Sequence, residues 1–477
     1  MQPARQHANL SGRKQRGSSA THGVRQATLC VSDSSERSVP TMQNHQQKHI
    51  AIIGGGITGV TSAYTLAKAG FRVTLIERNR YAGMETSYAN GGQLSASNAE
   101  VWTHPSTIVK GLKWMFTKDA PLLMNPTPTW HKISWMAEFV AAIPKYRDNT
   151  IATTRLAIAA RQHLFNWAEA EGIDFNHERK GILHIYRNKA GFDHAGEVSK
   201  LLAAGGLERR AVTPEEMRAI EPTLQGNYYG GYFTESDSTG DIHKYTHGLA
   251  QACARLGVHT RYGTSVQRTS SNGKTALVHL RGEQGDETLV CDAVVVCAGV
   301  QGRALAAQLG DRLNIYPVKG YSITVELEDA ASQQAAPMVS LLDDETKLVT
   351  SRLGQDRFRV AGTAEFNGIN RDIRAERIRP LVDWVNQCFP GVNTRRVEPW
   401  AGLRPMMPNM LPRVGPGRQA NVFYNTGHGH LGWTLSAITA HQLVGHVQAH
   451  FAQAFKSYTL LELGKTMKPE THIRQEA

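Results

Sequence analysis

A glycine-rich turn near the start of the chain limits the possible folds more than any other stretch. Residues 50–53 form a short apolar run typical of a buried strand, and Gly54, Gly56 and Gly59 follow as G-x-G-x-x-G. Residues 60–69 then have helical periodicity. In this context the glycines permit a tight turn, close approach of the backbone to a pyrophosphate, and close packing of helix on strand. The stretch predicts a dinucleotide-binding unit with the pyrophosphate on the helix N-terminus.

A second predicted strand, at residues 71–76, supports this interpretation because an acidic residue follows it. The carboxylate of Glu77 lies at the position that accepts hydrogen bonds from an adenosine ribose. Its negative charge disfavours the 2′-phosphate of NADP. A tight turn that binds no nucleotide is the alternative.

Composition limits the class of protein. The 477 residues are enough for a large core and two joined domains, and the net charge is +12. The basic residues are not gathered into a helix or arm beside aromatic residues, so nucleic-acid binding is not indicated. Attraction to anionic substrates or to an anionic membrane surface explains the charge equally well.

We expect no metal site and a reducing compartment. The five cysteines have no metal-ligand spacing, and Glu235, Asp237 and Asp241 are predicted to cap a helix and form a turn. Free cysteines and the lack of a long apolar run predict a cytoplasmic protein. Peripheral attachment to the inner face of the bacterial plasma membrane is the alternative.

Residues 1–48 differ from the rest of the chain. They are basic and rich in Ser, Gln and His, with Asp33 and Glu36 as their acidic residues. Because they lack an apolar segment, they do not form a secretory signal. We expect a disordered extension in which Met42 starts the functional protein, with an organellar transit peptide as the alternative.

Two later stretches resume the pattern of a nucleotide domain. Residues 293–299 form a nearly continuous apolar run that ends in Gly299, typical of a buried parallel strand. Residues 421–434 combine a strand with a Gly- and His-rich turn, and residues 435–449 are predicted to be helical. Because these stretches lie far from the first strand, we expect the nucleotide domain to be interrupted by an inserted domain.

The inserted region mixes helices and strands. Residues 101–150 indicate either a helical insertion with core aromatic residues or a hydrophobic cover for a substrate or membrane, and they contain Trp102, Trp114, Met115, Trp130, Trp135 and Met136. Alternating polarity predicts an antiparallel sheet with one wet face over residues 317–325, 348–352 and 358–362. Further helices are predicted at residues 156–172, 245–256 and 378–388 and from Thr213, and further strands at residues 181–186, 230–234 and 258–262.

Six motifs occur together in a recognisable order. They are G-x-G-x-x-G with Glu77, Glu-Thr-Ser-Tyr-Ala-Asn at residues 85–90, residues 294–299, residues 317–322, Trp-Ala-Gly-Leu-Arg-Pro at residues 400–405, and Asn-Thr-Gly-His-Gly-His-Leu-Gly-Trp at residues 425–433. With them the chain resembles the glycine oxidase/D-amino acid oxidase superfamily of FAD enzymes from about residue 49 to about residue 455. Within it, the chain is most similar to the bacterial D-amino acid dehydrogenases of the small subunit type.

The resemblance implies an α/β fold in which a mixed or antiparallel-sheet substrate domain is inserted between the strands of a Rossmann-like FAD-binding domain. The expected boundaries are 1–48 for the N-terminal extension, 49–100, 236–312 and 396–455 for the FAD-binding domain, 101–235 and 313–395 for the helical insertion and antiparallel sheet of the substrate domain, and 456–477 for a C-terminal tail.

The resemblance also implies FAD as the cofactor. The implied binding residues are Ile53, Gly54, Gly55, Gly56, Ile57, Thr58, Gly59, Glu77, Arg78, Thr86, Ser87, Asn90, Val266, Ala298, Gly299, Gly427, Gly429, Leu431, Gly432, Trp433 and Thr434. We expect non-covalent attachment, since no cysteine follows Cys388 to form a late thioether. A histidyl bond is the alternative.

The implied activity is oxidative deamination of D-amino acids to 2-oxo acids and ammonia. A hydride passes to flavin N5, and the electrons then pass to a quinone or another acceptor. Arg404 is the implied ligand of the substrate carboxylate, since a guanidinium donates two parallel hydrogen bonds to it. A salt bridge within the sheet is the alternative.

Other residues of these motifs have two interpretations each. Tyr321 either closes over the substrate or packs on its own strand. His428 and His430 are expected to pack against or hydrogen-bond the flavin, with proton transfer as the alternative. We expect Lys319 to be a solvated lysine at a strand end, with tuning of flavin or oxygen reactivity as the alternative.

Two departures from the usual motifs leave the preferred substrate open. Thr is usual where this chain has His430, and Thr-Pro-Asp-Gly is usual where it has Met407-Pro-Asn-Met410. An oxidase of glycine, sarcosine or a cyclic imino acid such as D-hydroxyproline is the alternative activity. A nicotinamide dehydrogenase is a further alternative, which the second glycine-rich turn disfavours. The last alternative is a non-catalytic nucleotide-binding or nucleic-acid-binding protein, and only the net charge supports it.

Overall fold

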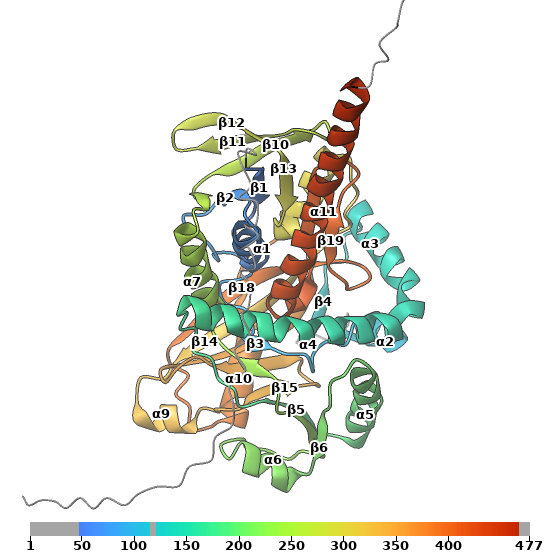
Figure 1. The fold of residues 1–477 in the computed structure, drawn as a ribbon. Helices are drawn as coiled ribbons and strands as arrows, with labels where there is room; N and C mark the ends of the chain where they lie inside the picture. The colour runs from blue at the N-terminus through green and yellow to red at the C-terminus, as the bar shows by residue number, and fades with distance from the viewer. Residues whose placement is uncertain (1–46, 115–120, 467–477) are drawn as a thin grey trace, which may run out of the picture. The chain divides into compact units, whose positions relative to one another are not determined.

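The computed structural model describes residues 47–114 and 121–466. The predicted N-terminal extension lies outside the described residues up to residue 46, and Met115 also lies outside them. Two large sheets organise the described chain (Figure 1).

The first sheet has six strands in the order β19-β20-β13-β1-β2-β9. Their bounds are β1 His49–Ile53, β2 Arg72–Ile76, β9 His259–Arg261, β13 Ala293–Val296, β19 Arg413–Pro416 and β20 Val422–Thr426. All neighbours are parallel except β19, which pairs antiparallel with β20 at the edge. All residues of β1, β13 and β20 are buried, as expected for parallel strands that are covered on both faces, and β13 is accordingly a continuous apolar run.

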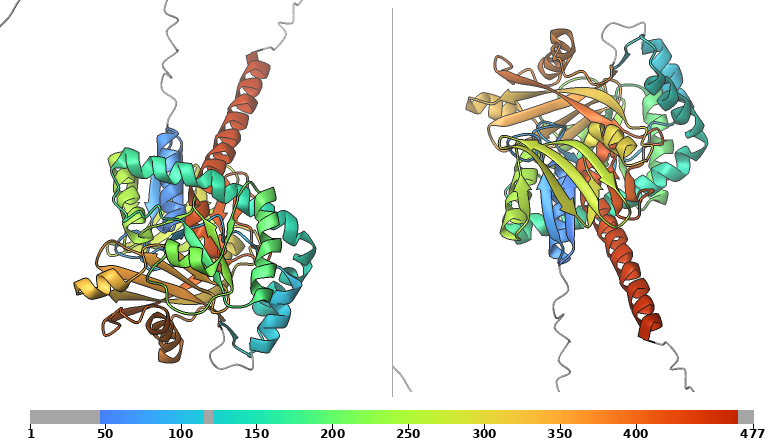
Figure 2. Two further views of the ribbon diagram at one scale, coloured as in Figure 1. Left: turned by 90° about the horizontal axis from the view of Figure 1, so that it is seen from below. Right: turned by 90° about the horizontal axis from the view of Figure 1, so that it is seen from above.

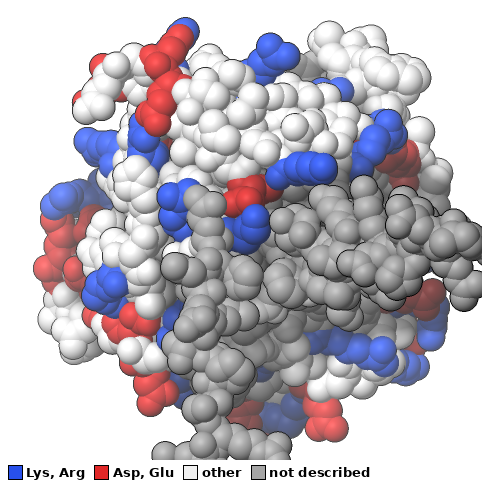
Figure 3. Space-filling model, turned by 45° about the horizontal axis from the view of Figure 1, so that its top comes forward, with Lys and Arg blue, Asp and Glu red and all other residues white. Residues whose placement is uncertain are grey.

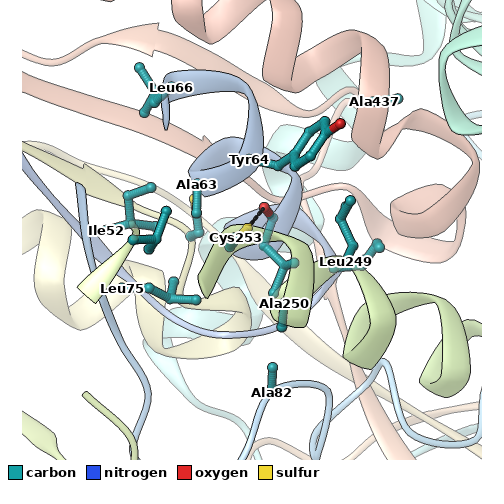
Figure 4. Packing of buried hydrophobic residues seen from close by; sticks show 14 of the residues in the cluster. Ile52, Ala63, Tyr64, Leu66, Leu75, Ala82, Leu249, Ala250, Cys253 and Ala437 are labelled. Atoms are coloured by element: carbon teal, nitrogen blue, oxygen red, sulfur yellow. Dashed lines mark hydrogen bonds between the residues drawn. The ribbon is translucent and has the colours of Figure 1, made fainter. Parts of the chain in front are cut away.

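Helices and a small sheet cover the two faces of this first sheet. One face packs in a single hydrophobic cluster with α1 (Ile57–Lys68), α4 (Tyr146–Glu171), α7 (Ile242–Arg255) and α11 (Gly432–Thr466). Figure 4 shows part of this cluster, where the Sγ of Cys253 donates to the carbonyl oxygen of Val60. The other face packs against α8 (Gly302–Gln308) and a meander of β10 (Ser265–Ser271), β11 (Ala276–Gly282) and β12 (Gly285–Cys291).

The second sheet has nine strands in the order β18-β14-β17-β16-β15-β5-β7-β6, with β4 beside β17. Their bounds are β4 Leu122–Met124, β5 Ile182–Tyr186, β6 Arg210–Val212, β7 Gly230–Thr234, β14 Tyr316–Glu326, β15 Ser340–Asp343, β16 Leu348–Arg352, β17 Arg357–Phe366 and β18 Val397–Met406. The pairs β15–β5 and β17–β4 are parallel and the others antiparallel. The predicted mixed sheet, inserted between strands of a Rossmann-like domain, is confirmed.

The prediction of one wet face for the antiparallel sheet is wrong. Ten of the eleven residues of β14 are buried. On one face, Ile323 packs in a cluster with Leu381 of α10 (Ala375–Cys388). On the other face, the hydroxyl of Ser322 donates to the carbonyl oxygen of Ala89 in the first domain. The sheet has no free face here because a helix and a second domain cover it.

Figure 2 shows the helices of residues 105–141 to one side of the two sheets, whereas the helix of residues 146–171 packs against α11 and α7 on the first sheet. They are α2 (Pro105–Trp114), α3 (Trp130–Ala141) and α4, which begins ten residues before the predicted start at residue 156. Trp135 is a core residue at 1% exposure, whereas Trp130 is 79% exposed, so the Trp-rich segment fits neither prediction as a whole. The side chain of Trp114 lies outside the described part.

Several remaining elements were predicted and others were not. Helix α6 (Pro214–Ile220) begins with the expected cap, since the hydroxyl of Thr213 accepts from the N–H of Glu216. Helix α5 (Lys189–Ala204) and the β10–β12 meander were not predicted. Short elements complete the fold, namely β3 (Gln93–Leu94), β8 (Ser238–Thr239) and α9 (Ala330–Ala335).

Two expected domain boundaries require correction. Strand β18 lies within the range 396–455 assigned to the nucleotide domain, but it pairs with β14 in the nine-stranded sheet. The return to the six-stranded sheet begins only at β19. Helix α11 continues through residue 466, beyond the expected start of a tail at residue 456.

We predict that Gly59→Ala destabilises the fold and reduces cofactor retention. A Cβ atom at residue 59 would lie 1.8 Å from the carbonyl oxygen of Gly54, so strand and helix must separate. The expected loss in unfolding free energy is about 1–3 kcal/mol or more. Thermal unfolding and the flavin content of the purified protein measure the effect.

Gly445→Ala is the matched control, because residue 445 lies in α11 with open space around its Cβ position. It should stabilise the protein by up to about 1 kcal/mol. Equal melting temperatures for the two variants would contradict the packing argument.

Candidate active site

One cavity of about 630 Å³ is lined by residues from both sheets and from all thirds of the described chain. Every predicted site residue lines it except Gly55 and Gly59. The fold therefore gathers motifs that are hundreds of residues apart in the sequence into one continuous site.

The glycine turn forms one end of the cavity. Gly54 has φ +110°, and a Cβ atom there would lie 2.6 Å from the carbonyl oxygen of Cys297 on the neighbouring strand end. Gly56 precedes α1 without a side-chain cap, and no acidic residue lies in the first turn. The N–H of Ile57 donates to the hydroxyl of Ser87 at 3.0 Å. With no cap from Gly56 and no acidic residue in its first turn, this helix N-terminus beside the cavity suits a pyrophosphate.

Glu77 lines the cavity at the same end as the glycine turn. Its carboxylate is buried and accepts from the N–H of Gly55 at 2.6 Å and from the N–H of Asn79 at 2.8 Å. Arg78 and Val266 line the cavity beside it. The carboxylate thus fixes the glycine turn to the second strand as well as lining the predicted adenosine site. Asn79 was not predicted, since nothing in its sequence context distinguishes it from a loop residue.

The predicted loop at residues 78–93 connects the two sheets. The hydroxyl of Thr86 donates to the carbonyl oxygen of Leu403 at 2.8 Å, next to Arg404. Asn90 forms an Asx turn, with its side-chain oxygen accepting from the N–H of Gly92. Thr86, Ser87 and Asn90 all line the cavity, so this polar segment runs from the glycine turn to the opposite end.

Arg404 lies at that opposite end, on β18. Its Nη1 donates to the carbonyl oxygen of Thr363 at 3.0 Å, and no salt bridge to Asp or Glu reaches it within residues 47–114 and 121–466. The guanidinium lies over Gly320 of β14, where a Cβ atom would be 2.1 Å from Nη1. Burial lowers the pKa of Arg404 to about 10, so the group is still a cation at neutral pH. The predicted alternative, a salt bridge within the sheet, is wrong.

Thr363 holds this guanidinium with an unusual backbone. Its φ is +57°, a left-handed conformation that costs a β-branched residue roughly 1–2 kcal/mol. The register between β14 and β17 shifts beside it, between Lys319 and Tyr321. Sequence reasoning missed Thr363 because the feature that matters is its carbonyl direction, which no side-chain pattern encodes.

His428 and His430 are both neutral. The Nε2 of His428 donates to the hydroxyl of Thr439 at 3.0 Å, since that hydroxyl's own proton goes to helix carbonyl oxygens. The Nε2 of His430 donates to the carbonyl oxygen of Asn98 at 3.1 Å. Burial lowers the pKa of His428 to about 3 and that of His430 to about 4. Because both rings are neutral and use Nε2 for hydrogen bonds within the protein, the structure favours packing against a bound group over proton transfer.

Tyr321 does not face Arg404. It borders the cavity, but its hydroxyl donates to Oε2 of Glu365 at 2.8 Å, and its side chain is 1% exposed. The structure therefore favours packing on its own strand over closure on a substrate.

The prediction that Lys319 is a solvated lysine at a strand end is wrong. Lys319 is fully buried in the middle of β14, with Nζ bonded to Asn370 and 3.4 Å from Oε1 of Glu365. Burial lowers its pKa. Lys319 and Tyr321 share the α10 side of the sheet, because alternate strand residues point to opposite faces.

Two acidic residues predicted to be structural have that role. Asp241 caps α7 and forms a salt bridge with Arg357, and Asp237 accepts from the N–H groups of Ala96 and Ser97. At the second departure from the usual motif, Met410 has φ +65°, a conformation in which glycine is usual.

We predict that His430→Thr reduces the acid sensitivity of the protein. The unfolded chain binds a proton at this histidine near pH 6.5, whereas the folded chain does so only near pH 4, so acidification favours unfolding. Between pH 7 and pH 5 the wild type should lose about 2 kcal/mol more unfolding free energy than the variant. Denaturant titrations at both pH values measure this, and the difference between the two proteins should be constant above pH 7. An equal loss in both proteins would contradict a neutral His430.

Comparison with known proteins places this architecture in a family. Residues 49–445 match the family of FAD dependent oxidoreductases named DAO. D-amino acid dehydrogenase 3 of Mesorhizobium japonicum is 63% identical over 394 residues, 83% of this chain and 95% of that protein. A D-amino acid dehydrogenase of Paramagnetospirillum magneticum is 42% identical over 81% of this chain and 92% of its own length.

Solved structures agree at the level of the fold. Glycine oxidase from Geobacillus kaustophilus superposes with a TM-score of 0.64 at 21% identity, over 84% of this chain and 95% of that one. L-proline dehydrogenase from P. horikoshii gives a TM-score of 0.61 at 16% identity, over 84% and 92%. With its glycine turn, resumed parallel sheet and inserted mixed sheet, this chain belongs to the DAO family of FAD-dependent oxidoreductases.

Proposed function

We propose that this enzyme uses FAD to oxidise D-amino acids to 2-oxo acids and ammonia. The observation that carries the proposal is Arg404, a partly buried cation without an acidic partner among the described residues, at the end of the cavity opposite the glycine turn. The relatives named as D-amino acid dehydrogenases support the choice of substrate.

The residues of the cavity fit FAD. The adenosine and pyrophosphate would be held by Glu77 and by the N-terminus of α1. Gly427 and Gly429 have φ values of +78° and +60° and form the turn before α11, whose N-terminus lines the same cavity. Buried polar atoms near this turn have no protein partner among the described residues, namely Thr426 Oγ1, His428 Nδ1 and Trp433 Nε1. We propose that the attachment is non-covalent.

Arg404 would orient the substrate. Its remaining N–H groups can donate two parallel hydrogen bonds to a carboxylate, while Nη1 stays bonded to the carbonyl oxygen of Thr363. When bound, FAD accepts the hydride from the carbon that carries the amino group. The lowered pKa values of His428 and His430 make both rings weak bases that cannot take a proton from an ammonium group at neutral pH, so we propose that the substrate binds with a neutral amine. Water then hydrolyses the imine.

We propose a quinone or another carrier as the electron acceptor in place of oxygen, with an association at the membrane periphery. No helix among residues 47–114 and 121–466 is long and apolar enough to span a membrane. Figure 3 shows basic and acidic side chains interspersed on the surface. Helix α3 exposes the apolar side chains of Trp130, Ile133 and Val140, which supports the proposed association with a membrane. Peroxide formed under air would instead identify an oxidase of glycine, sarcosine or a cyclic imino acid.

Anaerobic bleaching of the flavin tests the proposed reaction directly. D-amino acids should bleach the visible absorbance of the purified protein, and the matching L-amino acids should not. Bleaching by glycine, sarcosine or a cyclic imino acid alone would contradict the proposal.

We predict that Arg404→Ala retains FAD but raises the apparent KM for D-amino acids by about two orders of magnitude or more, because the carboxylate loses a charged partner in a buried site. Steady-state kinetics and flavin content measure the two effects. Arg396→Ala is the control, since Arg396 is exposed and pairs with Glu328 just before β18. Unchanged kinetics in Arg404→Ala would exclude the assigned role.

We predict that Gly320→Ala weakens substrate binding through Arg404. A Cβ atom at residue 320 would occupy the place of the guanidinium, so the apparent KM should rise about tenfold or more while FAD is retained. The effect should nearly vanish in an Arg404→Ala background, because both changes remove the same contact. Additive effects of the two substitutions would show that Gly320 acts elsewhere.

A further inference from the structure

An aromatic wall stands beside the proposed carboxylate ligand. Trp102 and His430 both line the cavity, and their rings stack with centroids 5.1 Å apart and planes inclined by 20°. We propose that this stacked pair receives the substrate side chain and selects D-amino acids with aromatic or large apolar side chains. The inference rests on the proposed function.

The pair is fixed from two directions. Trp102 lies just before α2, whereas His430 lies in the turn between β20 and α11. The Nε2 of His430 donates to the carbonyl oxygen of Asn98, four residues before Trp102. One short segment therefore holds the imidazole both by a hydrogen bond and by ring contact, so a ligand meets a preformed surface.

The wall lies next to the carboxylate site. An antiparallel bridge joins Met406, two residues after Arg404 on β18, to His428, two residues before His430, so the strand of Arg404 lies beside the turn that carries the imidazole. Thr363, which accepts from Arg404, is followed by Ala364, and Ala364 pairs with Leu122 of β4. A substrate held by Arg404 therefore has an aromatic and aliphatic surface within reach of its side chain.

Adjoining cavity residues extend this apolar character. Val101, Leu122 and Ala364 line the cavity and pack in or against one cluster that also contacts Trp102. The imidazole of His430 is neutral at physiological pH because burial lowers its pKa to about 4. Burying a charged side chain against such a surface is costly, whereas burying an aromatic ring is favourable.

The charged groups that line the cavity besides Arg404 have partners among the described residues, and Arg209 donates to the hydroxyl of Ser199 at 2.9 Å and to the carbonyl oxygen of Ala195 at 3.1 Å. Glu100 accepts from the hydroxyl of Tyr146 at 2.6 Å. Arg371 pairs with Glu85, and Lys347 pairs with Asp344. Arg404 would be occupied by the substrate carboxylate. The charge arrangement thus favours a neutral side chain over an acidic or basic one.

Anaerobic flavin bleaching by D-phenylalanine and D-alanine tests the inference in the FAD-loaded full-length enzyme. The wild type should show an apparent Kd for D-phenylalanine about tenfold or more below that for D-alanine. Trp102→Ala should raise the value for D-phenylalanine about tenfold and that for D-alanine less than about threefold. Trp102→Phe should restore most of the preference, because it returns an aromatic ring.

Control variants separate wall contacts from general damage. Trp130→Ala removes a 79% exposed tryptophan and should leave the preference unchanged. If Trp102→Ala fails to retain FAD, His430→Asn tests the same wall, since it removes the ring but keeps an N–H donor for Asn98. It should lower the D-phenylalanine to D-alanine preference in the same direction.

Binding of benzoate, read from the flavin spectrum, separates the inference from the proposed function, because benzoate has a carboxylate and a ring but no transferable hydride. Benzoate should bind the wild type more tightly than acetate, and Trp102→Ala should remove the difference. Bleaching by both D-amino acids without a preference that depends on Trp102 or His430 would overturn the inference alone. Tight, Trp102-dependent benzoate binding without bleaching by any D-amino acid would support the aromatic wall and overturn the proposed function.

Discussion

The contact between Gly59 and the carbonyl oxygen of Gly54 sets the geometry on which the site depends. With no Cβ at residue 59, α1 packs directly on the turn after β1. The helix N-terminus therefore opens into the cavity, and Glu77 can reach back to the N–H of Gly55. Any side chain at this contact would separate the helix from the sheet, and the pyrophosphate end of the cavity would lose its shape.

The chemistry is assembled at the opposite end by the second sheet. Its β14 is buried on both faces, with α10 on one side and the nucleotide-binding domain on the other. Gly320 leaves room for the guanidinium of Arg404, and Thr363 accepts one of its N–H groups. The substrate-binding cation is thus held by backbone features of two neighbouring strands, while its charged face is left for the ligand.

The sequence predicted what depends on residue type and local spacing. The glycine turn, Glu77 and the apolar strands are encoded by local pattern, and Arg404 was identified by its motif. Contacts that depend on tertiary context were not predictable. Lys319 was expected in solvent, because its partners Asn370 and Glu365 lie about fifty residues away and meet it only when β14 pairs with β17. Likewise, the stacking of Trp102 on His430 joins segments whose proximity no local pattern encodes.

The order of strands in the six-stranded sheet has a consequence for folding. The central strand β1 pairs on one side with β2, which follows it closely, but on the other side with β13, and the N–H of His49 bonds Asp292, 243 residues away. Strand β13 pairs on its other side with β20, which lies more than a hundred residues later in the chain. Loop closure over such separations is slow. During synthesis the glycine turn therefore leaves the ribosome long before its sheet can close, and the nucleotide site matures only when nearly the whole chain is present.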